Sequence, residues 1–161
     1  MAETLGSLVD KLTIKILREQ NLIDTINSKK GRFSLKELRQ KLRFVKSQKE
    51  DLKEEIEDFI SAALAGKVKR IKELKLKLYN AAKHIGKIPK VDRLSKAISL
   101  LSEKNIELWK LEDEARKVKA GYSYIGRVKR KIDLANQQRN DLIDTIDGLL
   151  EKCLKKNVSS S

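Results

Sequence analysis

The chain has 161 residues, a formal net charge of +14 and only 4% aromatic side chains. This length suits one domain, which can bury a hydrophobic core without disulfides. The only cysteine, Cys153, excludes an intrachain disulfide, and one cysteine with one histidine argues against a zinc site, a catalytic triad or a cysteine–histidine centre.

The composition predicts an all-α protein, because Leu, Ile, Lys, Glu and Ala dominate and the chain contains one proline. We expect a single-domain bundle of four to five long helices over residues 1–161, with the first and last helices paired centrally and 156–161 as a frayed tail. No apolar run approaches the roughly 20 residues needed to span a bilayer, and the N-terminus lacks a signal-peptide pattern. We therefore expect no membrane insertion and a cytoplasmic location.

Apolar residues recur three or four positions apart along most of the chain, which is the pattern of amphipathic helices. Ser34 and Glu37 form a capping-box pattern that starts the second helix at Leu35, and Pro89 marks the firmest break. Whether Gly66 ends the second helix or lies inside a longer one stays open. In chain order, the expected helices are Glu3–Asn27, Leu35–Gly66, Lys67–Ile85, Asp92–Ala120 and Ile125–Leu150.

The last of these helices carries two polar residues on its apolar face. Asn136 and Arg139 interrupt a regular apolar stripe. Removing a polar group from water costs a few kcal/mol unless it is paired, and an unpaired charge costs more. Asn136 and Arg139 therefore face either a solvated crevice or partners on another helix. The stripe consists of Ile125, Val128, Ile132, Ala135, Ile143, Ile146 and Leu150.

The first helix resembles the last one. Aligning Leu5–Asn27 with Ile125–Asp147 gives an identical Leu-Ile-Asp-Thr-Ile run and places Glu19 on Arg139. Glu19 also interrupts the apolar stripe of its own helix. We therefore predict that Arg139 is buried and paired with a carboxylate, Glu19 first and Glu112 second. The similarity is either an internal repeat or the convergence of two amphipathic helices.

A second polar cluster lies on the helix before the last. Asn105, Trp109, Glu112 and Arg116 share one helix face, and Asp113 adjoins them. This pattern fits a ligand pocket with an aromatic platform, and it equally fits an ordinary helix with a half-buried tryptophan and solvated acids. We expect Trp109 to be mostly buried, with Glu112 or Asp113 bonded to a basic or amide side chain of the last helix.

The positive charge is concentrated in two segments. Lys67–Lys90 contains Glu73 as its only acid, and Arg116–Lys131 contains no acid. Such segments favour anionic partners such as phosphates or nucleic acid, although solvated lysine-rich helix faces would look the same. If both segments serve one anionic partner, we expect them to form a continuous positive surface.

Three blocks, Leu5–Leu17, Leu108–Arg116 and Ile132–Leu150, resemble the signature blocks of an uncharacterised family. Its members are short helical bacterial and viral proteins, often encoded beside glycosyltransferases of surface-polysaccharide synthesis. The resemblance implies an association with glycan assembly without an established reaction. The residues to which it points are Asp10, Lys11, Trp109, Glu112, Asp113, Asn136, Arg139 and Asn140.

Three functional hypotheses follow. The first is a cytoplasmic binding or accessory protein that recognises an anionic ligand, a phosphorylated sugar or nucleotide-like molecule, or a glycosyltransferase partner. The second is a non-specific nucleic-acid binder, and the third is a helical-bundle enzyme that processes nucleotides. No cofactor is indicated, and a homo-oligomer is compatible with the pattern. The candidate ligand-binding residues are Asp10, Lys11, Glu19, Trp109, Glu112, Asp113, Arg116, Asn136, Arg139 and Asn140.

Overall fold

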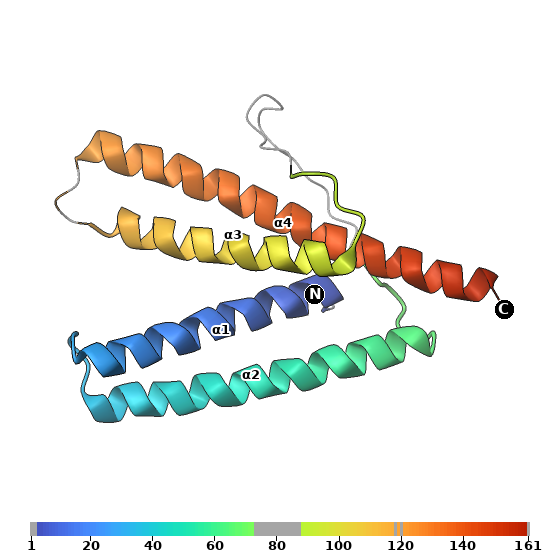
Figure 1. The fold of residues 1–161 in the computed structure, drawn as a ribbon, viewed down its shortest axis with the longest axis horizontal. Helices are drawn as coiled ribbons and strands as arrows, with labels where there is room; N and C mark the ends of the chain where they lie inside the picture. The colour runs from blue at the N-terminus through green and yellow to red at the C-terminus, as the bar shows by residue number, and fades with distance from the viewer. Residues whose placement is uncertain (1–2, 73–87, 118, 120, 161) are drawn as a thin grey trace.

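A computed structural model describes residues 3–72, 88–117, 119 and 121–160. Within these residues the chain forms four helices and no strand, which confirms the all-α helical bundle (Figure 1). None of the described helices is both long and apolar enough to cross a membrane. The helices are α1 (Leu5–Ser28), α2 (Leu35–Leu64), α3 (Leu94–Ala115) and α4 (Tyr122–Ser159).

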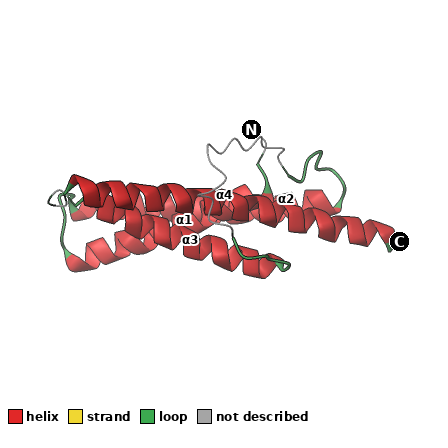
Figure 2. Ribbon diagram, turned by 90° about the horizontal axis from the view of Figure 1, so that it is seen from above, coloured by secondary structure: helices red, strands yellow, loops and turns green. Residues whose placement is uncertain are grey.

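Helix α1 is the element that joins the bundle. The closest neighbours are α1 with α2 and α3 with α4, and α1 also contacts both α3 and α4. Figure 1 shows α1 between α2 and the α3–α4 pair, with α1 and α4 running in opposite directions. The first and last helices therefore contact each other, but the expected central pairing was wrong in part, because α1 packs more closely on α2 and α4 on α3. Figure 2 shows the helices running alongside one another, while the C-terminal end of α4 extends past them.

Local sequence signals account for both ends of α2. The Ser34 N–H donates to Glu37 Oε2 at 2.8 Å, and the Glu37 N–H donates to Ser34 Oγ at 3.2 Å. This reciprocal pair confirms the predicted capping box. After Leu64, Gly66 has a φ of +67°, a conformation that glycine adopts at little cost. Gly66 therefore follows the end of the helix.

Three predicted helix ranges were wrong in part. The last helix, expected over Ile125–Leu150, runs from Tyr122 to Ser159 and so includes residues 156–159 of the expected frayed tail. The expected helix over Lys67–Ile85 is not formed at residues 67–72, and residues 73–87 lie outside the described part. The expected helix Asp92–Ala120 ends at Ala115. Leu111 is buried and Ala115 is half-buried, whereas residues 116 and 117 are exposed. The helix therefore stops where its contacts with the core stop.

The hydrophobic core is densest where the N-terminal end of α1 meets α3 and α4. In α1 only residues 5–10 include buried positions, and the remainder of the helix is half-buried or exposed. Figure 1 shows the ribbons of α1 and α3 diverging with distance from the N-terminal end of α1. The main core cluster consists of Leu5, Val9, Ala97, Leu101, Leu142, Ile143, Ile146 and Leu150. A second cluster, Leu108, Leu111, Val128 and Ala135, joins α3 to α4.

Candidate functional site

The site begins at the close crossing of α1 and α4. The N–H of Gly6 donates to Oδ1 of Asp147 at 2.7 Å, and Asp147 is only 2% exposed. Gly6 lies in the first turn of α1, where N–H groups lack acceptors within the helix. A buried carboxylate of α4 thus satisfies the positive end of α1. A Cβ at Gly6 would clash with the carbonyl oxygen of Ile143, so the helices touch at this point.

One turn further along α1, Asp10 binds Arg139 of α4. Arg139 Nε donates to Asp10 Oδ1 at 2.8 Å, and Nη2 donates to Oδ2, which makes the pair bidentate. The side chain of Asp10 is 6% exposed and that of Arg139 is 28% exposed. The structure confirms that Arg139 pairs with a carboxylate, but the arginine is half-buried and the predicted partners were wrong.

The direction of helix packing explains the error about Glu19. The alignment of the two helices would bring Glu19 beside Arg139 only if α1 and α4 ran in parallel. They are antiparallel, so residue numbers change in opposite directions along the contact. Gly6 meets Ile143, and therefore Asp10, four residues later, meets Arg139, four residues earlier.

Glu19 instead contributes to the α1–α2 contact. Its Oε2 accepts from Lys49 Nζ at 2.5 Å, and the side chains of Glu19 and Lys49 are 15% and 20% exposed. Nearby, Lys15 Nζ donates to Gln48 Oε1 at 2.6 Å. Glu19, which interrupts the apolar face of α1, therefore finds its partner on α2 and not on α4.

A buried amide completes the network around Asp10. Asn105 of α3 is 4% exposed, and its Nδ2 donates to Asp10 Oδ1 at 2.9 Å and to Thr13 Oγ1 at 2.7 Å. Thr13 Oγ1 in turn donates to the Asp10 carbonyl at 2.9 Å. Hydrogen bonding to Asp10 raises the pKa of Arg139, against the opposing effect of burial. Helices α1, α3 and α4 thus hold the guanidinium in one orientation.

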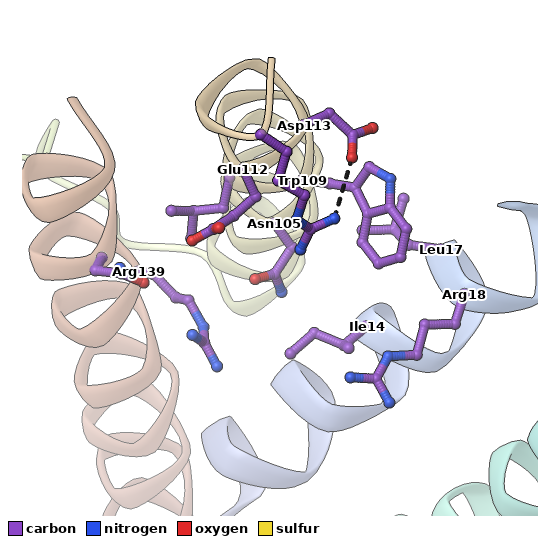
Figure 3. A pocket seen from close by; sticks show the side chains of 11 residues that line it. Ile14, Leu17, Arg18, Asn105, Trp109, Glu112, Asp113 and Arg139 are labelled. Atoms are coloured by element: carbon purple, nitrogen blue, oxygen red, sulfur yellow. Dashed lines mark hydrogen bonds and ion pairs between the residues drawn. The ribbon is translucent and has the colours of Figure 1, made fainter. Parts of the chain in front are cut away.

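A pocket of about 250 Å³ opens beside this network, between α1, α3 and α4. In Figure 3, Arg139 reaches in from α4 on one side, Trp109 lies on the other, and Arg18 of α1 lies near the tryptophan. The lining residues are Ile14, Leu17, Arg18, Asn105, Leu108, Trp109, Glu112, Asp113, Arg116, Asn136 and Arg139.

The structure brings most of the sequence-predicted residues together. Asp10 lies beneath the pocket as the partner of Arg139, whereas Glu19 faces α2. Lys11 is exposed and pairs with Glu3, and Asn140 is exposed and does not line the pocket. The predicted residues that line it are Trp109, Glu112, Asp113, Arg116, Asn136 and Arg139.

Glu112 and Asp113 of α3 do not bond to α4 as predicted, although Glu114 accepts a hydrogen bond from the hydroxyl of Tyr124 in α4 at 3.3 Å. Trp109 is half-buried, and both Glu112 and Asp113 are exposed. Asp113 Oδ1 accepts from Arg116 Nη1 of the same helix at 3.3 Å, the contact drawn in Figure 3. Glu112 forms no hydrogen bond or ion pair within the described residues. Two turns beyond Asn105 the helices have diverged, so these acids line the open part of the pocket.

Several residues of the site were missed in the sequence. Asp147 occupies the apolar face between Ile143 and Leu150, and an acid at such a position is a signal that could have been found. The sequence places Asn105 on the same helix face as Trp109 and Glu112, but Asn105 is not among the candidate ligand-binding residues. The sequence pattern does not single out Arg18, because its place in the pocket depends on how α1 diverges from α3.

The continuous positive surface expected of the two basic segments stays a prediction. At the end of the first segment, Ile88 and Pro89 line a pocket together with Glu103 and Glu107 of α3 and Gln138 of α4. Lys72, of the same segment, pairs with Glu151 of α4. Residues 73–87 of the first segment lie outside the described part. Within that same described part, no group of three or more His, Cys, Asp or Glu residues is placed to hold a metal ion.

Comparison with known families gives one match. Residues 95–161 match the model of a family described as "Protein of unknown function (DUF4254)". The match contains the Leu108–Arg116 and Ile132–Leu150 blocks, and it supplies every pocket residue except those of α1. Comparison with curated proteins and with solved structures found no match to this chain.

Proposed function

We propose that the pocket between α1, α3 and α4 binds a small anionic ligand that carries a ring, such as a phosphorylated sugar or a nucleotide-like molecule. The protein would then act as a binding or accessory protein. The observation that carries this proposal is the position of Arg139, which is held by a buried carboxylate while its side chain lines an open pocket beside Trp109.

The guanidinium of Arg139 retains donors for a ligand. An arginine has five N–H donors, and the contact with Asp10 uses those of Nε and one of Nη2. Because the side chain of Arg139 is already ordered, it loses less conformational entropy when a ligand binds to it. The Arg139–Asp10 pair is neutral as a whole. Arg18 supplies a positive charge for the anionic group of the ligand, since it is exposed and has no carboxylate partner within the described residues, and the unpaired Glu112 carries the opposite charge on α3.

The remaining lining residues suit a sugar ring. Trp109 offers an apolar face, and the carboxylates of Glu112 and Asp113 accept hydrogen bonds from hydroxyl groups. The half-buried amide of Asn136 provides both donors and an acceptor. The volume of about 250 Å³ lies just below the usual range for small-molecule sites, which favours a single ring with one anionic group.

The resemblance to proteins encoded beside glycosyltransferases gives this ligand a context. A protein that binds a phosphorylated sugar would serve glycan assembly by presenting the sugar to a glycosyltransferase partner. The proposal therefore joins the ligand and the partner in one role, and ligand binding is the part that can be tested on the isolated chain.

Calorimetry with glucose 1-phosphate and with inorganic phosphate tests the proposal. We expect the sugar phosphate to bind more tightly than phosphate alone, and Arg18→Ala to weaken it about tenfold, as loss of one charged hydrogen bond would do. Arg43→Ala is the matched control, because Arg43 is exposed on α2 and lies outside the pocket.

Two results would contradict the proposal. One is equal weakening by Arg18→Ala and Arg43→Ala. The other is an affinity that falls by orders of magnitude between 50 and 200 mM salt, because release of many counterions is the behaviour of a nucleic-acid-binding surface.

A further inference from the structure

A second pocket lies on the other side of Trp109, between α1 and α2. Its volume is about 490 Å³, and its lining includes Lys15, Arg18, Lys41, Phe44 and Trp109. Arg18 and Trp109 also line the first pocket, so the two pockets adjoin at these side chains. The first pocket is lined by both acidic and basic side chains, whereas the charged side chains of the second are all basic.

The α1–α2 pocket is lined by cations and by no acid. Three cations line it, and its described lining residues include no Asp or Glu. Lys15 Nζ contacts the neutral amide of Gln48, and Lys41 Nζ lies 3.7 Å from the ring centroid of Phe33. Burial, together with the charge of Arg18, lowers the pKa of Lys15.

The same hairpin shows how such a charge is normally compensated. One turn from Lys15, Glu19 pairs with Lys49 across α1 and α2. No cation of the pocket forms an ion pair with a carboxylate within the described residues, although the charge of Lys41 contributes to lowering the pKa of Glu37, one turn away on α2. An anion with more than one charge, placed between the two helices, would relieve the repulsion among them.

We propose that the α1–α2 pocket binds the nucleoside diphosphate part of the ligand whose sugar occupies the first pocket, so that the ligand class is a nucleoside diphosphate sugar. This inference rests on the proposed function. Arg18, at the junction, contacts the phosphate next to the sugar, and Lys15 and Lys41 contact the phosphates from the two helices. Phe44, which is 64% exposed, provides a face on which the base stacks.

The sizes of the two pockets fit this division. About 250 Å³ suits one sugar ring, and about 490 Å³ suits the larger nucleoside diphosphate. Lys15 and Arg18 are three residues apart, which places both on the same face of α1. Each pocket therefore carries the groups that one part of a nucleoside diphosphate sugar needs: acids and a tryptophan for the sugar, and cations with an exposed aromatic ring for the nucleoside diphosphate.

Calorimetry on the full chain with three probes tests the inference: glucose 1-phosphate, UDP and UDP-glucose. We expect UDP-glucose to bind at least tenfold more tightly than either part. Lys41→Gln should weaken UDP and UDP-glucose about tenfold and leave glucose 1-phosphate unchanged. Asn136→Ala, in the first pocket, should weaken the two sugar-containing probes and leave UDP unchanged. Lys46→Gln is the control, since Lys46 is exposed on α2 and outside both pockets.

The outcomes separate this inference from the proposed function. If Lys41→Gln matches Lys46→Gln while Asn136→Ala weakens glucose 1-phosphate, the diphosphate site is wrong and the first pocket stands. If glucose 1-phosphate does not bind, the proposed function and the two-part ligand both fail. Inorganic pyrophosphate that binds as tightly as UDP-glucose would also overturn the ligand class. As a second readout, NMR titration of Lys15 should show its pKa rising when UDP binds.

Discussion

At the scale of single residues, the site depends on Asp10. This carboxylate is almost fully buried, and it is tolerated because Arg139 and Asn105 both donate to it. A buried ion pair is weak evidence for added stability, since the loss of hydration offsets the attraction between the charges. The arrangement fixes the orientation of two side chains. The carboxylate of Asp10 on α1 holds both Arg139 of α4 and Asn105 of α3 in place.

A double-mutant cycle at Asp10 and Arg139 measures this coupling. We expect Arg139→Ala to lower the free energy of unfolding by about 3 kcal/mol, because it leaves a buried carboxylate without its cation. Asp10→Ala should cost a similar amount, and the double mutant should cost clearly less than the sum. Urea denaturation followed by circular dichroism gives these values.

Glu19→Ala is the comparison for that cycle. It removes a half-buried pair with Lys49 at the α1–α2 contact and should cost about 1 kcal/mol. Strict additivity at Asp10 and Arg139 would show that the two charges do not depend on each other. A loss of ligand binding by Arg139→Ala without any loss of stability would assign the arginine to the ligand alone.

The sequence predicted the need for a partner at Arg139 but not its identity. A charge on an apolar face must be compensated, and this argument is local to one helix. Choosing the partner required the direction in which α1 packs on α4, and no residue of either helix encodes that direction by itself. Asp10 entered the candidate set only through the family resemblance, because in its own helix it reads as an ordinary surface acid.

At the scale of the helices, the α1–α4 crossing is set by a glycine. Gly6 allows α4 to approach the backbone of α1, and Asp147 then accepts the free N–H of the first turn. Helix ends with side-chain caps can be predicted from the sequence, as Ser34 and Glu37 show. The ends of α3 cannot be predicted in this way, since α3 has no side-chain cap at its start and ends where its contacts with the core end.

The pair Gly6→Ala and Gly126→Ala tests the crossing. The two glycines occupy equivalent positions in the alignment of α1 with α4, but only Gly6 has neighbours within 4 Å of an added Cβ. Gly6→Ala should destabilise the protein by about 2 kcal/mol, because the helices must move apart. Gly126→Ala should instead stabilise it by about 0.5–1 kcal/mol through helix propensity. Thermal denaturation decides, and equal effects of the two changes would mean that the close approach does not exist.

At the scale of the whole molecule, packing density falls from one end of the bundle to the other. The fully buried residues Ala97, Leu101 and Ile146 lie around the N-terminal end of α1, and the first pocket opens where α1 separates from α3. Helix α2 packs mainly on α1, and only four of its 30 residues are buried. A binding site at the looser end can adjust to a ligand while the dense end keeps the helices in register.

Native-state hydrogen exchange should reveal this gradient. Amides in the buried turns of α3 and α4 and in the first turns of α1 should exchange only through global unfolding, whereas α2 should also exchange through a partial opening of lower free energy. Leu101→Ala, at a fully buried position, should cost about 3 kcal/mol and speed exchange everywhere. Leu52→Ala, on α2, should speed exchange mainly within α2. If α2 is protected as strongly as α3 and α4 in the unchanged protein, the four helices form one cooperative unit and the looser end is not a separate feature of the fold.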